Sequence, residues 1–159
     1  MISVSWPRGF TLVELLMVMV LLGILAAAAT SLYAGRSDFE VRAGQDFVIN
    51  AVREAQQVAM ARTADSSVQL RLVYAGGLLS SQILAQSGSG FSSQTDLSSE
   101  LYGGTDLAAS CASLASTPLQ LAFDGNGQLT IGQSYRLCAP AGFEVCISAS
   151  GYAYAGSCL

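Results

Sequence analysis

The sequence contains neither lysine nor histidine, and its seven basic residues are all arginine. Without histidine it lacks the commonest general base, and without lysine it lacks the serine–lysine pairing of some hydrolases. Its eleven Asp and Glu residues give a formal charge of −4, and only Arg136 among the basic residues lies beyond residue 71. Such a chain lacks the basic footprint of a nucleic-acid-binding protein. We therefore predict a protein that is not an enzyme, needs no cofactor, and has nucleic acid as an unlikely partner.

The chain has a long apolar run near its N-terminus. From Phe10 to Tyr33 these 24 residues would form a helix of about 36 Å, which is enough to cross a bilayer. Glu14 lies near the start of this run, and an ionised side chain in a membrane segment costs about 2.5–3.5 kcal/mol on insertion scales. We therefore expect a partner of opposite charge for Glu14.

Two general interpretations of this N-terminal segment leave Glu14 unexplained. A secretory signal peptide would have Arg8 as its charged region, Leu15–Leu25 as its apolar region and Ala26–Ala29 as its cleavage site. A signal anchor would keep Arg8 in the cytoplasm and leave the apolar run in the membrane. Neither interpretation has a use for a carboxylate at the front of the run.

The helical pattern changes character at Gly35. Ser37-Asp38-Phe39-Glu40 has the spacing of a capping box, which predicts a kink or a restart of the helix before it continues to about Arg62. Apolar residues at helical spacing predict an amphipathic segment that packs on its own domain. They are Phe47, Val48, Ala51, Val52, Ala55, Val58 and Ala59.

Beyond Arg62 the pattern is typical of strands and turns. Residues 86–105 are rich in Ser, Gly and Thr, which predicts a long surface loop with a helical turn near Leu97–Leu101, and Asp106–Ala115 is predicted as a short helix. Alternation of side chains and turn residues predict the strands. These are Val68–Tyr74, Leu78–Ala85, Leu119–Phe123, Gln128–Ile131, Tyr135–Ala139, Phe143–Ala149 and Tyr152–Ala155.

Two smaller features allow a functional and a structural interpretation. Asp124-Gly125-Asn126-Gly127 favours a hairpin turn over a calcium site, because two oxygen ligands fall short of the usual six to eight. Tyrosines in the C-terminal part would either form an exposed adhesive surface or complete the packing of a small sheet. They are Tyr102, Tyr135, Tyr152 and Tyr154.

Four cysteines, Cys111, Cys138, Cys146 and Cys158, lie in the C-terminal third. The chain has no C-x-x-C spacing and no histidine to support a metal site, so an even number of cysteines beyond a membrane segment predicts two disulfides in an oxidising compartment. Four cysteines allow three pairings. Register predicts Cys138 opposite Cys146 through the loop around Gly142, and Cys146 opposite Ala155 through the Ser150-Gly151 turn.

The segment Arg8-Gly9-Phe10-Thr11-Leu12-Val13-Glu14-Leu15 closely resembles the class III signal of type IV pilins and type II secretion pseudopilins. The resemblance implies that a prepilin peptidase cuts after Gly9 and N-methylates Phe10. It also implies that Glu14 meets the N-terminal amine of a neighbouring subunit in the assembled filament. Other pilin or pseudopilin subunits, the peptidase and an inner-membrane assembly platform would then be the partners.

The family also implies an architecture. The fold would be α+β and type IV pilin-like, with a long N-terminal helix packed on a small antiparallel β-sheet domain. Residues 1–9 would be the leader, 10–34 the transmembrane and assembly helix, 35–62 its amphipathic half, and 63–159 a periplasmic β-rich domain. The protein would cross the inner membrane once and then enter a pilus or pseudopilus.

The C-terminal half resembles a family subtype more loosely. The Phe123–Gly127 turn, followed by a strand and a hairpin, is similar to the GspH/FimT-type minor pilin domain. Four cysteines set the chain apart from many secretion pseudopilins and favour a minor pilin, such as one of the mannose-sensitive haemagglutinin pilus type. The resemblance implies the disulfides Cys146–Cys158 and Cys111–Cys138. The alternatives are a type II secretion pseudopilin and a DNA-uptake pilin.

Overall fold

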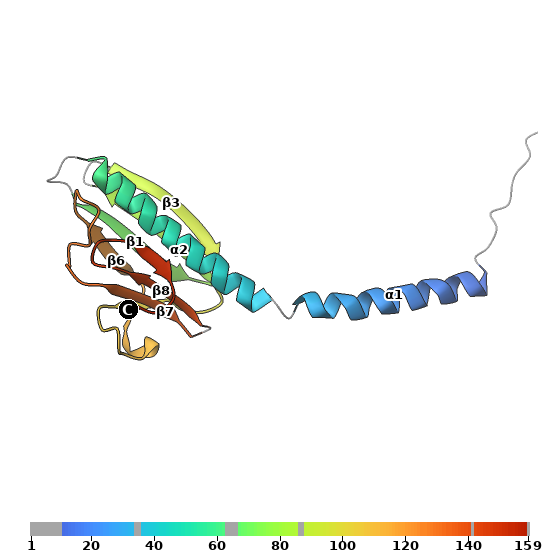
Figure 1. The fold of residues 1–159 in the computed structure, drawn as a ribbon. Helices are drawn as coiled ribbons and strands as arrows, with labels where there is room; N and C mark the ends of the chain where they lie inside the picture. The colour runs from blue at the N-terminus through green and yellow to red at the C-terminus, as the bar shows by residue number, and fades with distance from the viewer. Residues whose placement is uncertain (1–10, 34–35, 63–66, 86–87, 141, 159) are drawn as a thin grey trace, which may run out of the picture. The chain divides into compact units, whose positions relative to one another are not determined.

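The computed structural model describes residues 11–33, 36–62, 67–85, 88–140 and 142–158. Its chain divides into two compact units, Met1–Arg36 and Ser37–Leu159. The first contains the helix α1 (Leu12–Tyr33), and the second contains nearly all of α2 (Arg36–Met60) and two antiparallel sheets (Figure 1). The α+β class predicted from the sequence is therefore confirmed, and the two helices agree with the restart that was predicted near Gly35.

The helix α1 is apolar around its whole circumference. Its large apolar side chains from Leu12 to Leu25 are all exposed, the least exposed being Val18 at 43%. Among the helices in the described part of the chain, none has the length and hydropathy needed to span a membrane.

The four-stranded sheet has the order β3-β2-β1-β6. Its strands are β1 (Val68–Ala75), β2 (Leu78–Ala85), β3 (Gly88–Asp96) and β6 (Leu119–Phe123). Leu70 of β1 lies opposite Ile83 of β2 and Leu121 of β6, and all three side chains are buried. The alternation read from the sequence therefore correctly assigns one face of this sheet to the core.

The five-stranded sheet has the order β5-β4-β7-β8-β9. Its strands are β4 (Tyr102–Gly104), β5 (Ala115–Ser116), β7 (Tyr135–Ala139), β8 (Phe143–Ile147) and β9 (Ala153–Ala155). A short 3-10 helix, η1 (Cys111–Ser113), precedes β5. Every pairing in this sheet is antiparallel.

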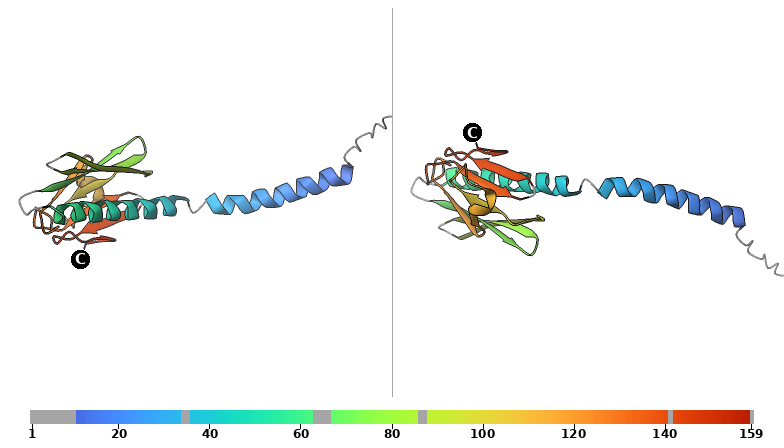
Figure 2. Two further views of the ribbon diagram at one scale, coloured as in Figure 1. Left: turned by 90° about the horizontal axis from the view of Figure 1, so that it is seen from above. Right: turned by 90° about the horizontal axis from the view of Figure 1, so that it is seen from below.

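The helix α2 closes the core of the second unit. Figure 2 shows it running between the strands of the four-stranded sheet and the last strands of the other sheet. Val48, Val52, Ala55 and Ala59 on its apolar face are completely buried. They join one hydrophobic cluster with residues of both sheets, so the predicted packing of this amphipathic segment on its own domain is confirmed.

Three sequence-based assignments are wrong. Residues 86–105 are not one long loop, because β3 and β4 lie there and Leu97–Leu101 forms no helical turn. Asp106–Ala115 contains η1 and the start of β5 in place of the expected helix, and Gln128–Ile131 makes a single bridge from Leu129 to Phe123. β3 has a loop-like composition, but its backbone pairs with β2 from Leu78↔Asp96 to Ala85↔Gly88. Long-range pairing has overridden local propensity.

Candidate assembly segment and the polar contacts of the domain

The start of α1 holds the candidate assembly residue, Glu14. Its backbone N–H donates to Oγ1 of Thr11 at 3.3 Å, and Leu15 N–H donates to the carbonyl of Thr11 at 3.2 Å. Thr11 is therefore the N-cap of α1. The Glu14 side chain lies in the first turn, where the helix dipole favours a negative charge, and it is exposed. Gly9 and Phe10, the predicted processing residues, lie outside the described residues.

Thr11 is a further residue of this site, and the sequence pattern around it indicates its role. Thr11-Leu12-Val13-Glu14 has the T-x-x-E spacing of a capping box, the same signal that was noted at Ser37–Glu40. The spacing was therefore sufficient to place the start of the helix. Glu14 is thus three residues into a capped helix, with its carboxylate free to reach another molecule.

The exposed surface of α1 determines what this segment can do. Unburied leucine and valine side chains on all sides favour transfer into lipid or contact with other apolar helices, at about 25 cal/mol per Å² of apolar surface buried. A carboxylate at the start of such a helix needs a cation in either environment. The segment is therefore built for contact with other chains or with lipid, since it buries little of its own surface.

Two disulfides brace the C-terminal part of the domain. Cys111 is joined to Cys138 and Cys146 to Cys158, with Cα–Cα distances of 5.9 and 5.1 Å, and these are the pairs that the family resemblance implied. The first ties the loop around η1 to β7, and the second ties the chain beyond β9 to β8.

The register predicted from the turns is wrong. Cys138 lies opposite Glu144, because Ala139 pairs directly with Phe143 across a shorter connection than expected. Cys146 lies opposite Tyr154 rather than Ala155. Neither disulfide therefore joins residues that face one another on neighbouring strands.

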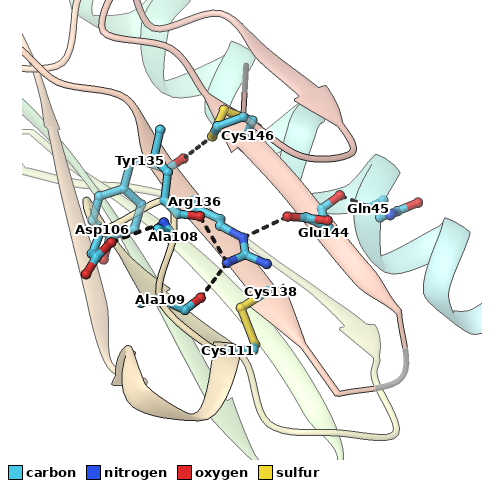
Figure 3. A network of polar contacts seen from close by, with 12 residues as sticks. Gln45, Asp106, Ala108, Ala109, Cys111, Tyr135, Arg136, Cys138, Glu144 and Cys146 are labelled. Atoms are coloured by element: carbon cyan, nitrogen blue, oxygen red, sulfur yellow. Dashed lines mark hydrogen bonds and ion pairs between the residues drawn. A yellow bond between two sulfur atoms is a disulfide. The ribbon is translucent and has the colours of Figure 1, made fainter.

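Arg136 in β7 is the centre of a polar network (Figure 3). Its Nε donates to Oε1 of Glu144 at 2.7 Å, and its Nη1 donates to the carbonyls of Ala109 at 2.8 Å and Leu107 at 3.4 Å. Gln45 of α2 donates through Nε2 to the backbone carbonyl of Glu144 at 3.0 Å. Arg136 therefore fixes the loop before η1 to the sheet, and this guanidinium is not available as a free surface cation.

Asp124 forms a turn, as predicted. Its Oδ1 accepts the backbone N–H of Asn126 at 2.9 Å and of Gln128 at 2.8 Å, and its carbonyl accepts the N–H of Gly127 at 2.9 Å. One oxygen of this carboxylate is thus engaged by the backbone of its own turn. Within the described residues, no group of three His, Cys, Asp or Glu side chains is placed to hold a metal ion.

The tyrosines divide between packing and exposure. Tyr135 packs against the hydrophobic core, and this burial raises the pKa of its phenol. Tyr102 donates its hydroxyl to Glu100 at 3.2 Å, and the negative charge of Glu100, followed by burial, raises the pKa of Tyr102. Tyr152 and Tyr154 stack with ring centroids 6.1 Å apart, and Tyr152 is 60% exposed. The packing interpretation therefore holds for Tyr135, and Tyr152 remains on the surface.

Comparison with known families bears on the N-terminal segment. Residues 7–30 match the prokaryotic N-terminal methylation motif. This match confirms the resemblance to type IV pilins and pseudopilins. The subunits of that structural class are anchored in the membrane, processed by prepilin peptidase and assembled into filaments. The match does not distinguish the GspH/FimT-type subtype. No curated protein and no solved structure matches the chain. The chain thus carries, over residues 7–30, the N-terminal motif of type IV pilins and pseudopilins.

Proposed function

We propose that this chain is a minor pilin or pseudopilin, cut after Gly9, N-methylated on Phe10 and incorporated through α1 into a type IV pilus-like filament. The methylation motif over residues 7–30, with Glu14 exposed in the first turn of an apolar helix, carries the proposal. Before incorporation the helix would anchor the protein in the inner membrane, with the disulfide-bonded domain in the oxidising periplasm.

Glu14 would act between subunits. Its partner would be the N-terminal amine of Phe10 in a neighbouring subunit. Two unit charges about 4 Å apart attract by about 4 kcal/mol at an effective dielectric constant of 20, and by more in a drier environment. This attraction would offset the cost of a carboxylate inside the helical bundle and set the axial position of the incoming subunit.

The two disulfides support a minor pilin over a type II secretion pseudopilin. They brace η1 and the chain beyond β9. Such covalent cross-links would stabilise a subunit that is exposed outside the cell. A DNA-uptake role has less support. Arg136, the last basic residue of the chain, is committed to Glu144 and two loop carbonyls, so it does not contribute to a basic surface.

Substitution of Glu14 tests this proposal. Glu14→Ala should insert into the membrane and be processed normally but should enter filaments at less than about a tenth of the wild-type level, since losing about 1.4 kcal/mol already costs tenfold. Asp46→Ala removes an exposed carboxylate from α2 and should be incorporated normally. Incorporation would be measured by immunoblotting of sheared filaments against membrane-retained subunit.

Two results would contradict the proposal at different points. Equal incorporation of Glu14→Ala and wild type would exclude the intersubunit role of the carboxylate. N-terminal sequencing of the membrane protein should show methylated Phe10, whereas a start near Ala29 or Thr30 would show an ordinary signal peptide.

A further inference from the structure

The outer face of the four-stranded sheet carries an unusual set of side chains. Along β1, Gln69 and Arg71 alternate with the buried residues Val68, Leu70 and Leu72 and so point away from the core. We call this surface the amide face, because exposed glutamines occupy it on each of the four strands. They are Gln69 on β1, Gln82 on β2, Gln94 on β3 and Gln120 on β6.

Arg71 lies in the middle of the amide face. Its direct neighbours across the strands are Gln82 on β2 and Gln120 on β6, which carry no charge. The Nε atom of Arg71 is buried and has no hydrogen-bond partner. The acidic residue of this face, Asp96, pairs with Leu78, which is four residues or about 13 Å along β2 from Gln82. A fixed positive charge is therefore surrounded by neutral groups that both donate and accept hydrogen bonds.

A hollow lies at Gln69, the next outward-facing residue to Arg71 on β1. It measures about 280 Å³ and is lined by Ser67, Gln69, Leu84 and Ala85. Gln69 and Leu84 are a directly opposite pair. On this face they are the pair next to Arg71 and Gln82. Sites for drug-sized ligands begin at about 300 Å³. This hollow is therefore of a size for one small ring, and two polar and two apolar residues line it.

We propose that the amide face binds a saccharide that carries one carboxylate, such as a uronic acid within an otherwise neutral oligosaccharide. The carboxylate accepts hydrogen bonds from the terminal nitrogens of Arg71, the geometry that a guanidinium serves best. The sugar hydroxyls exchange hydrogen bonds with Gln69, Gln82 and Gln120, and one ring occupies the hollow beside Leu84. This activity goes beyond filament assembly and does not depend on α1.

The composition of the face favours this ligand over other macromolecules. Protein interfaces concentrate their energy in aromatic anchors and exclude water around them. The described side chains of this face are mainly amides and hydroxyls, with Arg71, Asp96 and the aliphatic residues Val73, Leu78 and Leu84, and they include no aromatic ring. Proteins bind nucleic acids through several cations that contact the phosphate backbone. The amide face has one arginine, and the whole chain has a formal charge of −4. A sparsely charged, hydroxyl-rich molecule complements the face in charge and in hydrogen bonding.

A pair of matched probes tests the proposal on the full-length protein in detergent micelles. The acidic probe is a xylotriose that bears one 4-O-methylglucuronic acid, and the neutral probe is xylotetraose. Saturation-transfer difference NMR and calorimetric titration should show at least about tenfold tighter binding of the acidic probe. Arg71→Gln should abolish that preference, and Gln120→Ala should weaken both probes by about threefold. Arg53→Gln, which removes an exposed arginine from α2, should leave both affinities unchanged.

Several results would overturn the proposal. Equal binding of the two probes, or no binding of either at millimolar concentration, excludes an acidic-saccharide site. An acidic-probe preference that survives in Arg71→Gln places the site elsewhere. Tighter binding of an acidic peptide or of a DNA oligonucleotide than of the acidic saccharide assigns the face to another class of ligand. Thermal unfolding of each variant verifies that the domain stays folded, and filament incorporation, which tests the proposed function separately, should not change in Arg71→Gln.

Discussion

Gly151→Ala should destabilise the domain strongly, because this glycine lies where two turns and α2 meet. Gly151 has a φ of +86°, and its N–H donates to the carbonyl of Ser148 at 2.8 Å. Gln56 of α2 donates through Nε2 to the carbonyl of Gly127 at 2.9 Å. A Cβ atom at position 151 would overlap both the Gly127 carbonyl oxygen and the Gln56 side chain. The first of these is backbone and cannot rotate away.

The expected magnitude has two parts. An alanine in the left-handed region costs about 1–2 kcal/mol, and overpacking against a fixed backbone atom costs about 1–3 kcal/mol more. At about 4 °C per kcal/mol for a domain of this size, a loss of roughly 3 kcal/mol lowers the melting temperature by about 12 °C. Gly132→Ala is the matched control, since Gly132 has a φ of +64° and a Cβ there would meet nothing within 4 Å. It should lose about 1 kcal/mol, or about 4 °C.

Differential scanning calorimetry of the full-length variants in detergent micelles would measure both changes. The comparison separates the cost of backbone conformation from the cost of contact, because the two glycines share the first and differ in the second. Equal melting temperatures for Gly151→Ala and Gly132→Ala would refute the argument that this junction is closely packed. Adding Gln56→Ala to Gly151→Ala should restore only part of the loss, since the Gly127 carbonyl stays in place.

The disulfides and one tyrosine give two further expectations. The entropy lost on cross-linking the unfolded chain grows with the length of the closed loop. Replacing Cys111 and Cys138, which are 27 residues apart, by alanine should therefore lower the free energy of unfolding by about 3.5 kcal/mol. Replacing Cys146 and Cys158, which are 12 residues apart, should lower it by about 2.8 kcal/mol. Urea unfolding would measure this order, and its reversal would contradict the entropic account. Burial raises the pKa of Tyr135 above its unfolded value near 10, so the unfolded state releases its proton first and stability should fall as pH rises above about 10. Tyr135→Phe should flatten this loss in unfolding curves from pH 8 to 11, and an unchanged slope would exclude Tyr135 as its source.

Local patterns account for much of what was predicted correctly. The period-two alternation of Val68, Leu70 and Leu72 placed β1 on the core, and the helical spacing of Val48, Val52 and Ala55 placed α2 against it. The Asp124 turn was readable because an Asp side chain bonds to the backbone within a few residues. Each of these signals involves residues close together in the chain, so their physics is present in a short stretch of sequence.

Non-local contacts account for the errors. β3 has the Ser, Gly and Thr composition of a loop, and only pairing with β2 makes it a strand. The loop before η1 has a helix-like sequence, but Arg136, which is 27 and 29 residues away, donates hydrogen bonds to its carbonyls. The two cysteine registers were wrong because each depended on the length of one connection, and a small error there changes which residues face each other.

By itself the sequence determined that the N-terminus is an apolar segment with a methylation motif and one carboxylate, Glu14. These features are contiguous in the chain, so they can be recognised without long-range contacts. The sequence also determined, through the alternation of side chains along Val68–Tyr74, that this strand would have one apolar face. Only the tertiary structure decided that Arg71 would lie between Gln82 and Gln120, because these residues are brought together from three strands by antiparallel pairing. A surface assembled from distant segments has no sequence pattern of its own, and its charge and hydrogen-bonding groups become visible only when the strands are in register.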